Sequence, residues 1–466
     1  MTMEVLADWV SRISNVVWNG LLLYLLVGTG IVFTIRTRFV QVRKFGAGWK
    51  HLFGHFSLNG EKAGKDGMSP FQALTTAIAA QVGTGNIAGA ATALYSGGPG
   101  AIFWMWLSAF FGMSTIYGEA VLAQKYKTTD DKGHVTGGPI YYIRARFTGK
   151  FGKFLAGFFS VAIIFALGFT GNMVQANSIS VAFNTAFGAP MIVVGIICAI
   201  IAAFIFLGGV GRIAAVTEKV VPIMALFYMG GAVVVLWVHR ANLPQAFAQI
   251  CSMAFDTRAG TGGVLGYGMT QAVRAGVSRG IFSNEAGLGS SVMVHTAADA
   301  KEPCEQGMWA VFEVFFDTIV MCSVTAFVIL TSGVYDVSRY ALASGTPLLS
   351  QLTTGAQLTA EAFSTVFGRF GGGFVAVSLA LFAFSTLLGW SYYGQRAAAY
   401  LMRERVIPVY KAAFLLAAVA GCMMRLEPVW ALSDTFNGLM ALPNLAGVLA
   451  LRRQVIAEWC RYKRNL

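Results

Sequence analysis

The stretch AAQVGTGNIAG, residues 79–89, decides the fold. It interrupts a long apolar run with two closely spaced glycines, Gly83 and Gly85, and each glycine disfavours helix by about 1 kcal/mol relative to alanine. Polar Gln81 and Asn86 stand at the same level, near the middle of the run. Unwound backbone at that depth in a membrane is tolerated only where it faces protein or a wet cavity. The stretch therefore predicts a membrane helix broken at its middle, although such glycines also suit close helix packing.

A second stretch repeats this pattern later in the chain. The sequence GIFSNEAGLGSS, residues 280–291, places three glycines and several polar groups inside another apolar run. Glycine-broken helices at corresponding places in two halves are the best sequence pointer to a transporter binding site. The pair predicts a five-plus-five inverted repeat preceded by one additional helix. The expected segments are an extra helix with a basic cytoplasmic loop (1–67), the first half (68–240), an external connection (241–261), the second half (262–452) and a basic cytoplasmic tail (453–466).

The composition places the whole chain in a membrane. Hydrophobic residues make up 56% of the 466 residues and charged residues only 12%, and the mean hydropathy is +0.64. Soluble domains carry roughly 25% charged residues, so a folded aqueous domain of this size is excluded. A helix needs about 20 apolar residues to cross the hydrocarbon core, and about eleven segments are long enough. They are 17–35, 70–96, 99–124, 153–185, 190–209, 213–238, 264–298, 306–333, 371–400, 407–424 and 428–451. We therefore predict an all-α polytopic membrane protein whose first helix is retained rather than cleaved as a signal peptide.

The distribution of basic residues predicts the orientation. Lys and Arg account for the net charge of +13, and they cluster in residues 36–65, 125–153, 396–411 and 452–464. These clusters fall on one side if the spans alternate, and basic loops remain in the cytoplasm. We therefore expect a multi-pass protein of the inner membrane with its N-terminus outside and its C-terminus in the cytoplasm. Clusters of this kind do not indicate nucleic-acid binding.

The connection 334–370 and the cysteines are two further features of the sequence. The external connection 334–370 is too long for a turn, and its apolar stretches 347–352 and 360–367 predict short helices that form either a lid or a plain interfacial layer. The six cysteines are scattered without Cys-x-x-Cys spacing, which is typical of packing residues.

The ninth expected span supplies a partner for the first interruption. Ser385 and Thr386 are adjacent hydroxyls in an otherwise apolar helix, and the Phe382 carbonyl lies one turn earlier. Together with freed carbonyls of Ala79 and Val82, these groups would form an oxygen cage of the kind that a hard cation such as sodium prefers. In the alternative reading, the hydroxyls bond back to carbonyls of their own helix. Trp390, one turn further on, would form a wall of a substrate pocket or anchor the helix at the membrane interface.

Ionisable residues inside the expected spans are also candidates, because each costs at least about 2.5–3.5 kcal/mol at the bilayer centre. They are Glu119, Arg274, Arg279, Glu285, His295, Glu313 and Asp317. Glu313 and Asp317 lie four apart on one helix face, so we expect Arg274 or Arg279 to neutralise them, with a proton or sodium relay as the alternative. Glu285 lies inside the second interruption, where it would brace the unwound backbone or contact a substrate amine.

Four motifs resemble the alanine-or-glycine:cation symporter family, within the amino acid–sodium transporter superfamily. They are GGPGAIFWMWLSAFFG at 97–112, GTGNIAG at 83–89, GGP at 137–139 and SNEAGLG at 283–289, and the likeness extends over essentially the whole chain. The resemblance implies that residues 82–86 wrap a substrate carboxylate, that the hydroxyl pair binds sodium and that Gln175 faces the substrate, with Asn172 and Asn177 as neighbouring candidates. The expected substrate-binding residues are Thr84, Gly85, Asn86, Gln175, Phe282, Ser283 and Trp390, and the expected sodium-binding residues are Ala79, Val82, Phe382, Ser385 and Thr386.

The sequence and the resemblance together predict a sodium-coupled symporter that imports a small neutral amino acid by alternating access. Alanine and glycine are the first candidates, and Gln81 beside the break leaves serine and glutamine open. A proton-coupled permease of the same fold, which would depend on Glu119 or Glu285, is the main alternative. No metalloprotease or hydrolase motif supports an intramembrane enzyme. The expected partners are the amino acid, the sodium ion and membrane lipid, with no organic cofactor, no nucleic acid and no implied oligomer.

Overall fold

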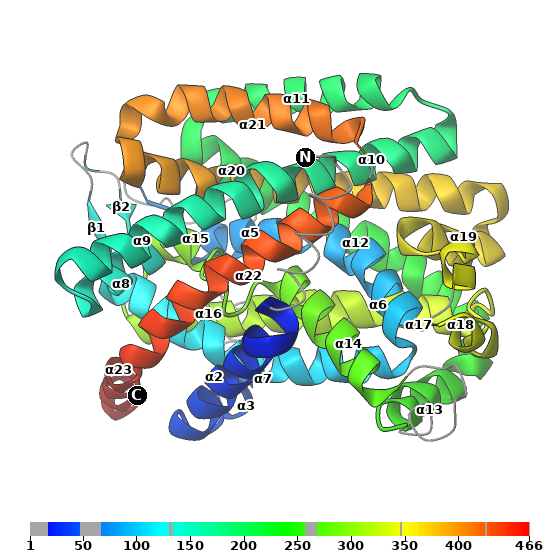
Figure 1. The fold of residues 1–466 in the computed structure, drawn as a ribbon, viewed down its shortest axis with the longest axis horizontal. Coiled ribbons are helices and arrows are strands. Elements are labelled where there is room, and N and C mark those ends of the chain that lie inside the picture. Colours follow the sequence, from blue (N-terminus) through cyan, green and yellow to red (C-terminus); the bar gives the residue numbers. More distant parts are fainter. Residues whose placement is uncertain are drawn as a thin grey trace.

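The computed structural model describes residues 17–46, 67–129, 133, 135–256, 268–344, 347–424 and 426–465. This part of the chain is almost entirely helical, and its strands β1 (Thr128–Thr129) and β2 (Val135–Thr136) form one small antiparallel hairpin (Figure 1). The predicted all-α class is confirmed. Part of the basic segment 36–65 and part of the expected external connection 241–261 lie outside the described residues.

The helices fall into two runs along the chain. Up to residue 253 they are η1 (Val17–Leu22), α2 (Leu23–Arg36), α3 (Val40–Arg43), α5 (Pro70–Gln81), η2 (Gly85–Gly89), α6 (Ala90–Gly97), α7 (Gly100–Lys125), α8 (Pro139–Arg146), α9 (Gly149–Ile163), η3 (Ile164–Gly171), α10 (Asn172–Phe187), α11 (Met191–Leu207), α12 (Gly209–Val238), η4 (Arg240–Asn242) and α13 (Leu243–Met253). From residue 269 they are α14 (Met269–Asn284), α15 (Val292–Thr296), α16 (Pro303–Val314), η6 (Phe315–Cys322), α17 (Ser323–Thr331), α18 (Val337–Ala343), η7 (Pro347–Gln351), α19 (Gly355–Phe367), η8 (Gly368–Phe370), α20 (Gly371–Met402), η9 (Glu404–Val406), α21 (Ile407–Cys422), α22 (Leu426–Ala450) and α23 (Arg452–Asn465).

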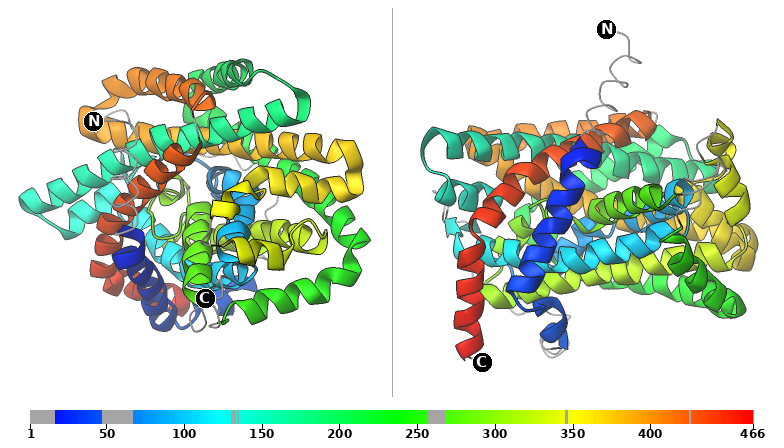
Figure 2. Two further views of the ribbon diagram at one scale, coloured as in Figure 1. Left: turned by 45° about the vertical axis from the view of Figure 1, so that its right-hand side comes forward. Right: turned by 60° about the horizontal axis from the view of Figure 1, so that its bottom comes forward.

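The expected spans coincide with these helices to within a few residues. Among the described residues, six helical stretches are long and apolar enough to cross a membrane, and α2 and α11 are shorter apolar helices. Several expected spans consist of α-helical pieces joined by a π-helical turn, as in α9–η3–α10 and α16–η6–α17. Figure 2 shows α2 lying against the outside of the bundle and α23 turning away from α22 at its edge.

The first interrupted helix is confirmed. Helix α5 begins with a capping box in which Ser69 and Gln72 bind each other's backbone amides, with a proline at the first helical position. It ends at Gln81, since Val82 leaves the helical region with ψ of 88°. The chain resumes as the π-helical turn η2 and continues into α6. The interruption is therefore only about two residues long, at Val82 and Gly83.

The second interruption is longer and begins later than the expected range suggests. Helix α14 continues to Asn284, and residues 285–291 are non-helical before α15 begins. Glu285 adopts a φ of 55° and Gly287 a φ of 88°, so the chain passes through left-handed backbone. Every residue from 73 to 91 and from 280 to 298 is buried. The two interrupted helices thus form the centre of the molecule.

The connection 334–370 forms short helices, as predicted. These are α18, η7 and α19. The Thr359 hydroxyl of α19 donates to the Ile87 carbonyl at 3.0 Å. The segment therefore rests directly on the second half of the first interrupted helix.

Candidate functional site

An oxygen cluster joins the first interruption to α20. The Ser385 hydroxyl lies 3.1 Å from the Ala79 carbonyl oxygen, and the Thr386 hydroxyl lies 3.1 Å from the same oxygen and 3.4 Å from that of Val82. Both hydroxyls also donate to the Phe382 carbonyl, at 2.8 and 3.1 Å. The hydroxyls therefore bond back within their own helix, as in one of the two alternatives, and also lie within hydrogen-bond distance of the carbonyls at the break.

The five residues predicted to bind sodium are thus brought together. All five are fully buried, and the cluster consists of three carbonyl and two hydroxyl oxygens. Neutral oxygen atoms suit a hard cation better than a transition metal, which prefers imidazole or thiolate. Among the residues searched, no group of three or more His, Cys, Asp or Glu side chains could hold a metal ion.

The absence of a side chain at Gly83 lets α10 and α20 approach the break. A Cβ atom there would collide with the Thr386 hydroxyl and lie 3.2 Å from the Gln175 side-chain oxygen. The Gly83 amide donates to the Asn86 side-chain oxygen at 2.9 Å, and the Thr84 amide donates to Gln175 at 3.2 Å. In this conformation the Gln175 oxygen therefore occupies the Thr84 amide, which lies in the stretch expected to wrap a substrate carboxylate.

Of the three candidate amide side chains on α10, only Gln175 contacts the break. Asn172 donates to the Phe414 carbonyl of α21 at 2.6 Å. Asn177 donates to the carbonyls of Gly421 and Met424, each at 2.8 Å. The two asparagines therefore attach α10 to α21, and Gln175 remains the residue of α10 that belongs to the site.

The two interruptions meet at a carboxylate that the sequence did not place in the site. The Asn86 amide donates to one oxygen of Asp317 at 2.7 Å, and the Ser283 hydroxyl donates to the same oxygen at 3.0 Å. The Thr318 hydroxyl donates to the other oxygen at 2.8 Å. A Cβ atom on Gly85 would lie only 3.0 Å from the Ser283 hydroxyl and 3.2 Å from its Cα atom. The first break is therefore packed directly against the end of α14.

Carbonyl groups are released where α14 ends. The Glu285 amide still donates to the Ile281 carbonyl at 2.9 Å. The next two amides turn elsewhere, since Ala286 donates to the Asn284 side chain at 3.0 Å and Gly287 to Glu119 at 3.1 Å. The carbonyls of Phe282 and Ser283 thereby lose their helical donors. They lie at the C-terminal end of a half-helix, which carries partial negative charge and attracts cations.

Glu285 braces the second interruption, as expected. One of its oxygens accepts a hydrogen bond from the Trp390 indole at 2.6 Å, and the other accepts one from the Ser290 hydroxyl within the break. The Trp390 ring packs edge-on against Phe282, with centroids 6.5 Å apart. Trp390 is therefore buried and attached by a polar contact to the break, rather than placed as an interface anchor.

A further pair of side chains holds the glycine of this break. Glu119 on α7 accepts the amide of Gly287, and Asn444 on α22 donates to the carbonyl of the same residue at 2.8 Å. Asn444 also donates to Glu119 and accepts a hydrogen bond from Tyr142. Both backbone groups of Gly287 are thus satisfied by neighbouring helices.

The expected pairing of Glu313 and Asp317 with arginine is wrong. Arg279 pairs instead with Asp434 at 2.6 Å. Glu313 accepts hydrogen bonds from the Gln81 amide and the Ser291 hydroxyl, each at 3.0 Å, and contacts His295 at 2.6 Å. Gln81 therefore points at Glu313 rather than into a substrate cavity. Among the described residues, Glu119, Glu285, Glu313 and Asp317 make no ion pair with lysine or arginine, and all are buried.

This combination of fold and site defines a class. Two interrupted helices expose backbone groups in the protein interior, and a neutral oxygen cluster joins one of them to a third helix. Broken helices with freed carbonyls and amides are how secondary active transporters bind ions and substrates inside the membrane. The protein is therefore a polytopic membrane protein of the transporter class.

Comparison with known proteins identifies the family. The sequence profile of the sodium:alanine symporter family matches residues 3–466, so the chain belongs to that family. Sodium/alanine symporter AgcS from Methanococcus maripaludis is 42% identical over 97% of this chain and 96% of its own length. Two proteins of Bacillus subtilis are each 37% identical: the probable sodium/glutamine symporter GlnT, with 99% of this chain and 92% of its own covered, and the amino-acid carrier protein AlsT, with 95% and 89%.

Solved structures agree on the fold. A Na+-coupled sialic acid symporter in a substrate-bound outward-open state superimposes with a TM-score of 0.54 at 14% identity, covering 92% of this chain and 86% of its own. A manganese transporter from Eremococcus coleocola gives a TM-score of 0.50 at 14% identity, with 79% and 74% covered. The relatives and structural neighbours are transporters, which points away from an enzyme.

Proposed function

We propose that this protein is a sodium-coupled symporter that imports a small neutral amino acid, with alanine and glycine as the first candidates. The observation that carries the proposal is the five-oxygen cluster, because it joins the break at Val82 to the hydroxyl pair on α20. A sodium ion held there by Ala79, Val82, Phe382, Ser385 and Thr386 would fix the position of the first break against α20. Ion binding thereby prepares the backbone that receives the amino acid.

The amino acid binds between the two interruptions. Its carboxylate displaces the Gln175 oxygen from the Thr84 amide and approaches the Gly85 amide, at the start of a half-helix that favours negative charge. Its amine approaches the released carbonyls of Phe282 and Ser283. Asn86 and Ser283 keep the two breaks in register through Asp317.

The size of the substrate side chain is limited by the surrounding rings. Phe282 and Trp390 are both nearly inaccessible, and Gly85 approaches Ser283 closely. This close packing favours a hydrogen or a methyl group as the side chain, as in glycine and alanine. Serine and glutamine remain further candidates, and glutamine would require the Phe282 and Trp390 side chains to move.

Alternating access would move the helices around this site. We propose that residues 68–240 and 262–452 are the two halves of an inverted repeat, with α2 added in front and α23 as a cytoplasmic tail. The protein lies in the inner membrane with its N-terminus outside. No side chain of the substrate or sodium set is more than 4% exposed, so the described conformation is closed around the site. Occupancy of both sites shifts the equilibrium between outward and inward states more than either ligand alone.

One sodium ion is sufficient to drive accumulation. Moving one elementary charge across 100 mV yields about 2.3 kcal/mol. At about 1.4 kcal/mol per tenfold change, this corresponds to roughly fifty-fold accumulation of the amino acid.

Uptake of radiolabelled alanine into proteoliposomes of the purified protein tests the proposal. An inward sodium gradient should drive uptake above equilibrium, and an equal potassium gradient should not. Unlabelled glycine, serine and glutamine added as competitors then rank the substrates. Alanine uptake that is equal in sodium and potassium would contradict sodium coupling.

A second candidate is proton coupling within the same fold. It is favoured by the buried carboxyl groups, including Glu313 with His295 at 2.6 Å, which have no lysine or arginine partner among the described residues. Uptake driven by a pH gradient without sodium would support this function. A pH gradient that drives no uptake in the absence of sodium would exclude it.

A further inference from the structure

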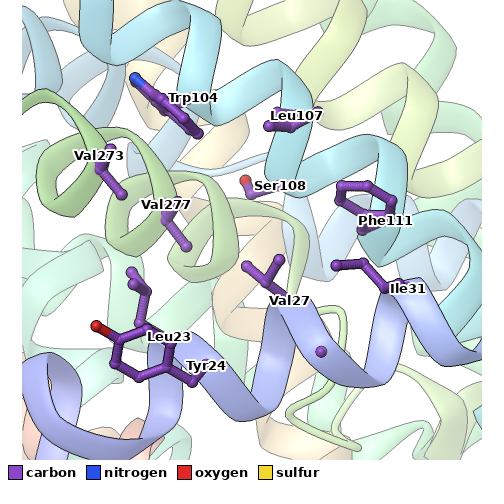
Figure 3. Close-up of a pocket in the computed structure, with 11 residues that line it drawn as sticks. Leu23, Tyr24, Val27, Ile31, Trp104, Leu107, Ser108, Phe111, Val273 and Val277 are labelled. Carbon is purple, nitrogen blue, oxygen red and sulfur yellow. The ribbon is translucent and has the colours of Figure 1, made fainter. Parts of the chain in front are cut away.

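An apolar groove runs between α2, α7 and α14, away from the site described above (Figure 3). Its volume is about 360 Å³, and its walls include Val27, Phe111 and Val277. Ten of its eleven lining residues present only carbon or an aromatic ring with at most one polar atom, and the eleventh, Ser108, donates its hydroxyl to the Met105 carbonyl at 2.9 Å. The groove therefore offers no hydrogen bond to a polar substrate along most of its length.

The two ends of the groove differ. Figure 3 shows Tyr24, Trp104 and Val273 towards one end and Phe111 and Ile31 towards the other. The first end lies near the starts of α2, α7 and α14, and the Tyr24 side chain there is 70% exposed. Tyrosine and tryptophan are enriched at the membrane–water interface, where a ring lies in hydrocarbon and a polar atom reaches water. The opposite end consists of hydrocarbon alone.

An unpaired positive charge stands beside the polar end. Arg274 follows the lining residue Val273 on α14 and is exposed. It makes no ion pair or hydrogen bond with any described residue, whereas Arg279, on the same helix, is paired with Asp434. An arginine near hydrocarbon is costly without a partner, and phosphate is a preferred bidentate partner of arginine.

We propose that this groove binds one acyl chain of an anionic phospholipid, with the lipid phosphate on Arg274. From Leu23 to Ile31 the groove follows α2 for about 12 Å at 1.5 Å per residue. Half of the hydrocarbon core is about 15 Å thick. The groove thus matches the acyl chains of one leaflet in length, in polarity along its axis and in charge at its end.

The additional N-terminal helix gains a role from this site. Helix α2 provides one wall, and α14, which ends at the second interruption, provides another. The lipid would therefore stabilise the contact between α2 and a helix of the transport site. The lipid site does not depend on which amino acid or ion the protein transports.

Native mass spectrometry of the full-length protein tests the site, using dioleoylphosphatidylglycerol as the anionic lipid and dioleoylglycerol, which has the same acyl chains and no phosphate, as the neutral one. A Cβ atom on Gly28 meets no atom within 4 Å, so Gly28→Phe introduces a ring into the groove from its α2 wall. Gly230→Phe on α12 is the matched control, because that glycine is equally open. We expect one tightly held lipid per protein, lost in Gly28→Phe and kept in Gly230→Phe.

A separate variant tests the contact between Arg274 and the lipid phosphate. Arg274→Gln should weaken phosphatidylglycerol binding about tenfold and leave dioleoylglycerol binding unchanged, since that lipid has no phosphate for the arginine to bind. Arg339→Gln, at another exposed arginine in α18, should alter neither. Equal lipid retention by Gly28→Phe and the unaltered protein would overturn the assignment of the groove, and equal retention of phosphatidylglycerol and dioleoylglycerol would overturn the phosphate contact. A dimer mass that Gly28→Phe abolishes, without bound lipid, would instead assign the groove to a second copy of the chain.

Discussion

At the residue scale, the Thr386 hydroxyl lies near more acceptor oxygens than its single proton can serve. Its single hydroxyl lies within 3.4 Å of carbonyl oxygens from both sides of the cluster, those of Ala79, Val82 and Phe382. One proton can satisfy only one of these acceptors fully. The surplus of acceptor oxygen atoms is what a bound cation would compensate.

Removing both hydroxyls should therefore weaken sodium binding selectively. We expect Ser385→Ala combined with Thr386→Ala to raise the sodium concentration for half-maximal uptake at least about tenfold, because hydrogen bonds and ligands to a charged group contribute about 1.5–3 kcal/mol. The measurement is alanine uptake as a function of sodium concentration. Ser378→Ala removes another buried hydroxyl of α20, whose one bond within the described part of the chain goes to the Phe374 carbonyl, and should leave the sodium dependence unchanged.

At Gly85 the available space, rather than charge, limits which side chain is tolerated. Gly85→Val would force its side chain against the backbone of Ser283, which lies 3.2 Å from the position of a Cβ atom. We expect loss of alanine binding in a protein that still reaches the membrane. The comparison is Gly89→Ala, whose nearest atom would lie 3.9 Å away and which should bind alanine normally. Alanine binding retained by Gly85→Val would mean that the break is not the carboxylate site.

The sequence alone singles out these residues because their chemistry is local. Hydroxyl pairs and glycines are conspicuous inside apolar runs, so Ser385, Thr386 and the Gly83 break could be found without coordinates. Asp317 was recognised as an unusual buried charge, yet its partners Asn86 and Ser283 could not be, since no local pattern reports contacts across hundreds of residues. The arginine partner was predicted for Asp317 from charge alone. Hydrogen bonds satisfy the Asp317 carboxylate instead.

At the element scale, Trp390 connects helix α20 to the second interruption. It lies one turn after the hydroxyl pair on α20 and donates to Glu285 in the second interruption. Helix α20 therefore contacts the first break through its hydroxyls and the second break through its indole. A displacement of α20 on sodium binding would reach both interrupted helices.

A double-mutant cycle measures this link. Trp390→Phe leaves the buried Glu285 carboxyl without one donor, and we expect it to lower the free energy of unfolding by about 1–3 kcal/mol. Glu285→Gln keeps an oxygen for the indole, and Trp390→Phe should be less harmful in that background because the unpartnered group is neutral. Thermal unfolding of the purified variants gives the comparison. Additive effects would show that the two side chains are not coupled.

The extent of each interruption was harder to predict than its existence. Glycine and polar residues marked both stretches, but the sequence did not show that α14 would continue to Asn284 or that the first gap would be only about two residues. These limits are set by side chains of other helices. Glu119 holds the amide of Gly287 and Gln175 holds that of Thr84, and both lie far away in sequence.

At the scale of the whole molecule, the arrangement of charges predicts how the protein sits in its membrane. Basic clusters remain on the cytoplasmic side. Cys460 in α23 is exposed, and the cysteines buried in the helices are protected. A membrane-impermeant maleimide should label Cys460 in inside-out vesicles and not in intact cells. Cys460→Ser is the control for labelling elsewhere, and labelling of Cys460 from outside would reverse the predicted orientation.

The contact between Asn86 and Asp317 also has a consequence for biosynthesis. The two residues are separated by 231 positions, so the ribosome needs about 10–50 s between them at 5–20 residues per second. During that interval the first broken helix has left the translocon, while its asparagine still lacks the acceptor that it will bind. The nascent N-terminal half is therefore a substrate for membrane quality control until the second half arrives, and truncations before residue 317 should be degraded rather than accumulate.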